Sequence, residues 1–317
     1  MWARRPGTAG RLALVVALAM TAGVATGARE ARAFTLGIAD QQASTFADAR
    51  LTGLGVRHAR VVVAWDAMRH RWQRAELDAW MQAARAAGVR PLVTFGPSRR
   101  KTGRILPAVR DYARQTGRLR RRYPHLREFS PWNEPNMARL AVNNDPRRIA
   151  GYYRALRAGC PSCTVLGADV VDSSSLERWM RAYVRQFAAG RRPRVWGLHN
   201  YVDANSASSW GTRTMLRLAG GRIWFTETGA IIRRAPPAGT SRSDRRHRIR
   251  AGHRHARAAT RRVFALARLS PRITRVYIYH WRADAAATWD SGLLSPGGAP
   301  RAAFEVFSAQ ARRQAGR

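Results

Sequence analysis

Lysine and acidic residues are scarce in this sequence. Lys101 is the only lysine, and 19 acidic residues oppose 57 basic ones, so arginine supplies nearly all of the formal net charge of +38. A strong charge of one sign bears on partners and solubility and does not determine the fold. Three explanations remain open: an arginine-biased codon usage without function, retention on an anionic cell wall or acidic polysaccharide, and nucleic-acid binding.

Nucleic-acid binding is the weakest of these explanations. A nucleic-acid site requires basic residues gathered in a recognisable binding motif. Arginine is instead spread over almost every segment that we expect to be helical. We therefore expect no specific nucleic-acid partner, and we keep an electrostatic association with an anionic cell wall as a hypothesis.

Long apolar runs are also scarce, and the one that stands out is residues 12–28. Arginines precede it and Ala31-Arg32-Ala33 follows it, an order typical of a secretory signal peptide and its cleavage site. An uncleaved membrane anchor is the alternative, but small and polar residues interrupt the run, and a spanning helix needs about 20 apolar residues. We expect residues 1–33 to be removed, no transmembrane anchor to remain, and residues 34–317 to be secreted or cell-wall associated.

Only two cysteines are present, Cys160 and Cys163. A pair this small without nearby ligands does not make a zinc site. In a cytosolic redox protein this spacing opens a helix and lowers the pKa of a thiol, whereas here it follows an expected helix and precedes an expected strand. In an exported chain the pattern therefore predicts a local structural disulfide.

The remaining 284 residues (317 minus 33) suit one large α/β barrel, which usually has about 250 residues. Short β-rich runs alternate with longer amphipathic segments, such as residues 75–87 before Gly88 and 147–158 before Gly159, and glycine is common just past a helix end. No glycine-rich phosphate motif follows the first run, which argues against a dinucleotide fold. The pattern predicts a single (β/α)8 TIM barrel, which we expect to be monomeric. The expected strands are residues 34–39, 59–64, 91–95, 128–133, 164–170, 195–200, 223–226 and 275–280.

One irregular stretch, residues 231–255, follows the seventh expected strand. It is rich in Arg, Pro, Gly, Ser and His. His247, His253 and His255 are interleaved with arginines, which repel a cation, so we expect a solvated loop and the start of a helix here, with no metal site.

Two glutamates directly follow strand-like apolar runs: Glu134 in residues 132–137 and Glu227 in residues 224–229. In a barrel, side chains at the carboxyl ends of the strands share one mouth, where active sites form. Cleavage of a glycosidic bond needs one carboxylic acid to protonate the leaving oxygen and one carboxylate on the other face of the sugar. A single such glutamate could simply carry charge at a helix start, but a pair after the fourth and seventh strands predicts an active site.

These motifs resemble the retaining glycoside hydrolases of clan A, which include cellulases, β-xylosidases, mannanases and β-1,3-glucanases. The resemblance covers the whole expected mature region. It implies that Glu134 is the acid/base and Glu227 the nucleophile, and that no metal or organic cofactor is required. It also implies a poly- or oligosaccharide substrate.

The same resemblance implies supporting residues for the substrate and the nucleophile. Asn133 would contact the sugar 2-hydroxyl, and Arg60, five residues before Trp65, would lie near the nucleophile. The other implied positions are His199 and Tyr201 on strand six and Trp281 as an aromatic floor after strand eight. Asp40 and Asp169 also end strands, and nothing in the sequence fixes their role.

The chain departs from many clan members because it is too short to carry an added β-sandwich. That weakens a β-xylosidase assignment and leaves the sugar, the linkage and endo or exo action open. One alternative is a secreted carbohydrate-binding barrel with little or no turnover. Another is a basic adhesin that binds anionic polymers with a steep salt dependence.

Overall fold

The computed structural model describes residues 34–100, 106–137, 145–234, 249–250 and 252–316. The predicted signal peptide and His247 lie outside these residues. Within the part that is described, no helix is long and apolar enough to cross a membrane.

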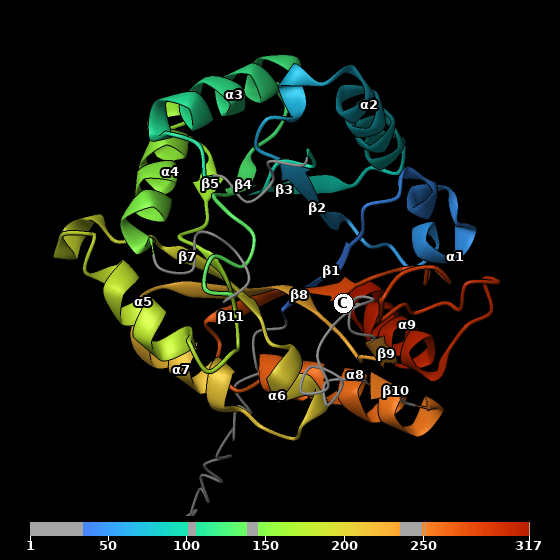
Figure 1. The fold of residues 1–317 in the computed structure, drawn as a ribbon. Coiled ribbons are helices and arrows are strands. Elements are labelled where there is room, and N and C mark those ends of the chain that lie inside the picture. Colours follow the sequence, from blue (N-terminus) through green and yellow to red (C-terminus); the bar gives the residue numbers. More distant parts are fainter. Residues whose placement is uncertain (1–33, 101–105, 138–144, 235–248, 251, 317) are drawn as a thin grey trace, which may run out of the picture. The chain divides into compact units, whose positions relative to one another are not determined.

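Parallel strands form one sheet in the order β5-β4-β3-β2-β1-β11-β8-β7-β6. Figure 1 shows these strands at the centre of a ring of helices. All eight expected strand regions are confirmed, and the fifth is divided into β5 and β6. The strands are β1 (Thr35–Ala39), β2 (His58–Ala64), β3 (Arg90–Gly96), β4 (Glu128–Ser130), β5 (Thr164–Val165), β6 (Asp169–Val171), β7 (Val195–His199), β8 (Arg222–Thr228) and β11 (Ile273–Tyr279).

The barrel closes at this divided fifth strand. β5 pairs with β4, and β6 pairs with β7. Beyond the end of β4, a parallel bridge joins Asn133 to Asp169 at the start of β6. The eight strand regions therefore form a closed (β/α)8 ring, as the sequence predicts.

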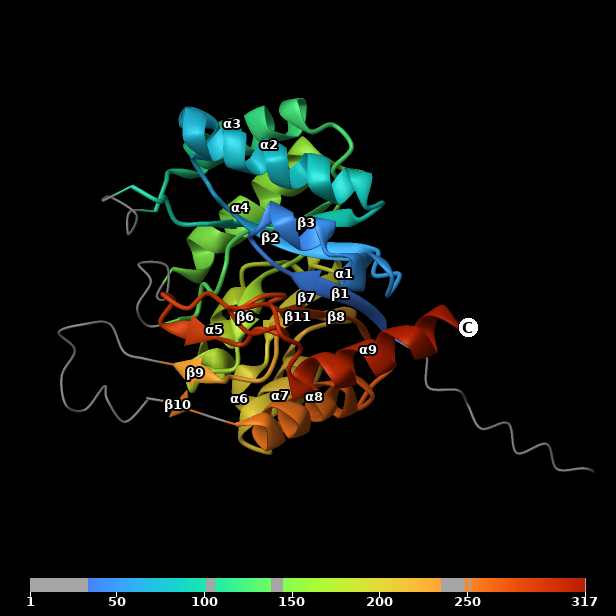
Figure 2. The ribbon, with the colours of Figure 1, turned by 90° about the vertical axis from the view of Figure 1, so that its right-hand side faces the viewer.

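A helical segment follows each strand region and covers the outside of the barrel (Figures 1 and 2). The helices are α1 (Ala49–Thr52), α2 (Arg71–Ala86), α3 (Val109–Arg122), α4 (Pro146–Gly159), α5 (Leu176–Val184), α6 (Tyr201–Asn205), α7 (Trp210–Leu218), α8 (His253–Ala267) and α9 (Ala302–Ala315). Each parallel strand followed by its helix places the helix starts and the strand ends on the same face of the barrel.

Helix α2 shows why the sequence folds locally in this way. It buries Leu77, Trp80 and Ala84, which recur at the three- and four-residue spacing of one helix face. It stops because Gly88 adopts a left-handed φ of 64° while its N–H bonds back to the Arg85 carbonyl. The prediction for Gly88 is confirmed, whereas Gly159 is the last residue of α4 and does not lie beyond it.

Two apolar layers fill the molecule, one between strands and helices and a smaller one inside the barrel. Six strand regions contribute to the inner layer, which consists of Ala39, Leu92, Leu166, Val195, Trp224 and Tyr277. The amino-terminal end of the barrel holds an ion pair between Arg275 and Glu128, with the guanidinium 3.8 Å from the Trp224 ring centre. Side chains fill the amino-terminal end of the barrel, so a functional site is expected at the carboxyl ends of the strands.

The stretch after β8 differs from the expected plain loop. β9 (Arg233–Arg234) pairs antiparallel with β10 (Ile249–Arg250) and with β12 (Trp289–Asp290) to form a small second sheet. The expected helix start is confirmed, because α8 begins at His253. Cys160 and Cys163 form the predicted disulfide, in the connection between α4 and β5.

Candidate active site

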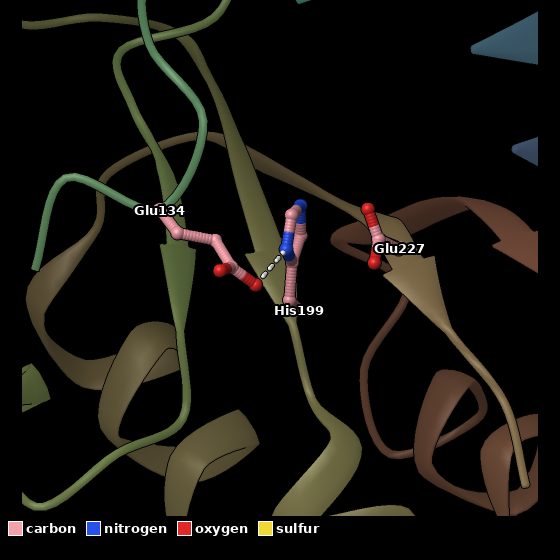
Figure 3. A group of neighbouring side chains, drawn as sticks. All are labelled: Glu134, His199 and Glu227. Atoms are coloured by element: carbon pink, nitrogen blue, oxygen red, sulfur yellow. Dashed lines mark hydrogen bonds and ion pairs between the residues drawn. The ribbon is translucent and has the colours of Figure 1, made fainter. Parts of the chain in front are cut away.

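The two glutamates meet at the carboxyl ends of the strands. Glu134 follows β4, His199 is the last residue of β7, and Glu227 is the penultimate residue of β8. One carboxylate oxygen of each glutamate and one ring nitrogen of His199 all lie within 4.8 Å of one another. Figure 3 shows His199 between the two glutamates. The glutamate side chains are 15 % exposed, so both carboxylates are accessible from the mouth.

Arg60, which lies inside the barrel on β2, connects four partners at this site. Its Nη1 donates to Glu227 Oε2 at 2.7 Å, and its Nη2 donates to Asn133 Oδ1 at 2.6 Å and to Asp169 Oδ2 at 2.8 Å. Its Nε donates to Thr94 Oγ1 at 3.0 Å. Burial alone would lower the pKa of Arg60, but the charges of Asp169 and Glu227 raise it above its ordinary value. Arg60 is therefore a permanent buried cation beside Glu227.

Both oxygens of Glu227 are held by donors. Arg60 binds Oε2, and the Tyr201 hydroxyl donates to Oε1 at 3.1 Å. The Tyr201 ring in turn contacts the Trp289 ring, with centres 4.9 Å apart. Hydrogen bonds to both oxygens fix the orientation of the carboxylate.

His199 is fully buried and links Glu134 to the network around Arg60. Its Nδ1 lies 2.9 Å from Glu134 Oε1, and its Nε2 lies 3.7 Å from Asp169 Oδ2. Burial would lower the pKa of His199, but the charge of Glu227 and the hydrogen bonds to Asp169 and Glu134 raise it to about 9. Nε2 also lies 3.2 Å from Arg60 Nη2, but the two hydrogens of Nη2 are already donated to Asn133 and Asp169. Nε2 therefore accepts no hydrogen bond from Arg60 and can carry its own proton. His199 is then an imidazolium, and its Nδ1 donates to Glu134.

Glu134, His199 and Glu227 carry donor atoms of the kind that bind divalent cations. A cation among them would sit beside the Arg60 guanidinium and would have to displace the proton of His199. The charges already present here do not fit a metal, and we continue to expect none.

The backbone at Glu134 has an unusual conformation. Its φ is +48°, in the left-handed region that residues other than glycine rarely adopt. Two features support it: the Glu134 N–H donates to the Asp169 carbonyl at 2.8 Å, and the side-chain amide of Asn136 pairs with both backbone groups of Val171. The loop after β4 is thereby fixed to β6, and it directs the Glu134 side chain toward His199.

Comparisons with known proteins were made at the levels of sequence and structure. No protein-family profile matches the chain, and no curated protein matches it in sequence. Solved structures do match. The native xylanase 10B from Thermotoga maritima has a TM-score of 0.64 at 11 % identity, with 90 % of this chain and 97 % of that chain covered.

Two longer proteins match as well. The exo-β-1,4-mannosidase Op5Man5 from Opitutaceae bacterium strain TAV5 has a TM-score of 0.62 at 16 % identity, with 90 % of this chain and 60 % of that chain covered. A family 39 glycoside hydrolase from Bacteroides cellulosilyticus WH2 has a TM-score of 0.57 at 14 % identity, with coverages of 89 % and 64 %. The chain thus spans less than two thirds of either protein. The chain shares the (β/α)8 barrel fold of these glycoside hydrolases. Identities this low show the fold alone.

Within this fold, one residue predicted to contact substrate, Trp281, is buried away from the mouth. Trp281 is 1 % exposed, its ring packs against Phe304 and Phe307 of α9, and its Nε1 donates to Asp48 at 2.9 Å. It therefore belongs to the layer between barrel and helices, and we do not assign it to substrate contact. The chain leaves the strand before Trp281, so the residue no longer follows the alternation of β11.

Two other aromatic residues, Tyr279 and Trp65, stand at or just beyond the carboxyl ends of strands. Tyr279, the last residue of β11, is partly exposed and stacks on His280 with ring centres 4.6 Å apart. Burial and then the charge of Glu227 raise the pKa of the Tyr279 hydroxyl. Trp65 follows β2, is partly exposed, and carries the Arg69 guanidinium 5.1 Å from its ring centre. The contact of Trp65 with substrate stays a prediction.

Sequence reasoning missed the supporting roles of Thr94, Asn136 and Thr226, and it left Asp169 without a role. Asn136 stands two residues after Glu134 in a motif that was singled out, so an amide able to pair with a neighbouring strand was the available signal. The two threonines gave no signal, because a polar residue in a strand reveals its partner only after the barrel has closed.

Proposed function

We propose that the protein is a secreted retaining β-glycoside hydrolase that acts on a poly- or oligosaccharide, with Glu227 as nucleophile and Glu134 as acid/base. The observation that carries this proposal is the short separation of the two carboxylates, whose nearest oxygens lie within 4.8 Å. Retaining enzymes have carboxyl groups about 5–5.5 Å apart, whereas inverting enzymes leave about 6.5–9.5 Å for a water molecule.

In the first step, Glu227 attacks the anomeric carbon and the bond to the leaving oxygen breaks. Glu134 gives its proton to that oxygen, and a covalent glycosyl-enzyme forms. Arg60 and Tyr201 orient the Glu227 carboxylate through the bonds to its two oxygens. His199 donates to Oε1 of Glu134 and thereby leaves Oε2 to carry the catalytic proton.

In the second step, Glu134 removes a proton from water, and the water oxygen attacks the same carbon and releases Glu227. The configuration of the sugar is retained because the carbon is inverted twice. Asn133 would bind the neighbouring hydroxyl through Nδ2, because its Oδ1 already accepts from Arg60. This chemistry needs no cofactor.

A panel of aryl β-glycosides tests the proposal, followed by trapping with a 2-deoxy-2-fluoro glycoside that reacts slowly in the second step. We expect turnover of at least one aryl glycoside and a mass increase of one sugar on the peptide that contains Glu227. The Glu227→Gln variant is the control and should remain unlabelled. No turnover of any aryl glycoside or natural polysaccharide, together with binding to one of them, would instead favour a carbohydrate-binding barrel.

A further inference from the structure

Asp169 is a fully buried carboxylate that the proposed steps do not use. It stands at the start of β6 and is 0 % exposed, so it cannot touch a substrate. Its Oδ2 accepts from Arg60 Nη2 at 2.8 Å, from Arg60 Nε at 3.2 Å and from Thr94 Oγ1 at 3.0 Å. Its Oδ1 accepts from the Thr226 hydroxyl. Three strands besides its own thus supply donors to this one side chain.

A fourth strand makes room for it. Gly197 on β7 faces the carboxylate, and a Cβ at that position would meet Asp169 Oδ1 at 1.9 Å. Residues on β2, β3, β7 and β8 are therefore all matched to a carboxylate at residue 169. A residue whose only task was to fill space would not need so many specific donors.

The charges explain what this carboxylate does. Arg60 is shared between two carboxylates, Asp169 below it and Glu227 at the mouth. His199 adds a second cationic group 3.7 Å from Asp169. With Asp169 removed, two buried cationic groups would act on Glu227 and Glu134 alone, and the Arg60 guanidinium would lose the partner that fixes its plane.

We propose that Asp169 is a positioning residue that locks Arg60 in the plane needed to reach both Glu227 and Asn133, and that balances the buried positive charge so that Glu227 remains a reactive nucleophile. This inference rests on the proposed roles of the two glutamates. It assigns Asp169 an action through Arg60 and His199, without contact to substrate. Burial would raise the pKa of Asp169, but the Arg60 charge lowers it well below its ordinary value, so the carboxylate is ionised throughout the range of interest.

The test replaces Asp169 with asparagine, which keeps the shape and removes the charge. We expect kcat on an aryl glycoside to fall by about 10²-fold, a loss typical of a misplaced catalytic group, with a smaller change in KM. The alkaline limb of the pH profile should move to lower pH, because His199 would lose a nearby negative charge and give up its proton at lower pH. A merely structural role would not move this limb.

Asp172 offers a matched control on the same segment. It is also buried, but it accepts from the backbone N–H groups of Val202 and Asp203 and has no contact with Arg60 among the hydrogen bonds of the described residues. Burial raises the pKa of Asp172 to about 7, so an amide resembles its protonated form. The Asp172→Asn variant should keep the wild-type pH profile. The same shift in both variants, or none in Asp169→Asn, would overturn the proposal.

Two further measurements keep the proposal testable. If Asp169→Asn does not fold, Thr226→Val is the second variant, because it removes one donor to Asp169 while the carboxylate charge remains. We expect kcat to fall roughly tenfold, the effect of one net hydrogen bond. An unchanged kcat would contradict the proposal. The NMR titration of His199 needs no turnover: its pKa should fall in Asp169→Asn and stay in Asp172→Asn. An unchanged titration overturns the proposal, whereas a shifted titration in an enzyme inactive on every glycoside would refute only the proposed function.

Discussion

Gly197 faces the carboxylate of Asp169 inside the barrel with no room for a side chain between them. A Cβ on residue 197 would also lie 2.7 Å from the Thr226 hydroxyl. Strand β7 thus has no side chain at this position, and the Asp169 carboxylate from the adjacent strand β6 fills the space. The buried Asp169 holds Arg60, and Arg60 in turn holds the Glu227 carboxylate at the mouth.

The Gly197→Ala variant should therefore be both less stable and less active. Overpacking of a well-packed interior costs about 1–3 kcal/mol, and the displaced carboxylate would carry Arg60 with it. Urea unfolding and kcat on an aryl glycoside measure the two effects. Gly190→Ala is the control, because a Cβ there meets nothing within 4 Å. Wild-type stability and rate in Gly197→Ala would show that the layer is more adaptable than we infer.

The charge on His199 should make part of the stability depend on pH. Its folded-state pKa of about 9 lies above the ordinary 6.5, so this contribution is complete below about pH 6.5 and is lost as the pH rises through 9. The difference in free energy of unfolding between wild type and His199→Gln should accordingly shrink from pH 6 to pH 10. The exposed His125, whose pKa is lowered, provides the control variant His125→Gln. A difference that grows with pH would mean that His199 is neutral in the folded protein.

The disulfide between Cys160 and Cys163 should matter little for activity. The two residues lie between α4 and β5, at the end of the barrel opposite the candidate site. They enclose a short loop, and stabilisation should stay below the ~3 kcal/mol expected for a 15-residue loop. A Cys160→Ser/Cys163→Ser variant should keep the wild-type kcat and lose only a few degrees of Tm. Two alkylatable thiols in unreduced protein would contradict the disulfide itself.

The arginine-rich surface should act separately from catalysis. If it holds the protein on an anionic cell wall, added salt will release the protein, because exposed charges are screened beyond about 10 Å at 0.1 M salt. Turnover of a neutral aryl glycoside should change only modestly over the same range. Pull-down with cell-wall material and a rate assay at matched salt concentrations check this, and a parallel collapse of both would refute the separation.

The sequence was sufficient for the barrel, because strand and helix periodicity repeats eight times and each repeat supports the same fold. The strand-end pattern predicted Glu134 and Glu227 as site residues, and the resemblance to clan A glycoside hydrolases predicted Arg60 and His199. The series of contacts that links Glu227 to Arg60, Arg60 to His199 and His199 to Glu134 follows from the closure of the barrel through Asn133 and Asp169.

Trp281 shows where the sequence was insufficient. It stands two residues beyond the end of β11, and its indole packs against Phe304 and Phe307 of α9. Asp169 shows the converse, since its importance comes from donors on β2, β3 and β8 that are far apart in the sequence. Long-range contacts of this kind become visible only in the closed structure.

The central claim is the division of labour between Glu227 and Glu134, and chemical rescue with azide tests it most directly. Glu134→Ala should still form the glycosyl-enzyme from substrates whose leaving group needs no proton, and azide should then release it as the β-glycosyl azide. Loss of the acid should cost about 10²–10⁴-fold on poor leaving groups and much less on good ones. Glu227→Ala should be inactive and should yield, with azide, at most the α-glycosyl azide. A β-glycosyl azide from Glu227→Ala, with none from Glu134→Ala, would contradict the roles assigned to the two residues.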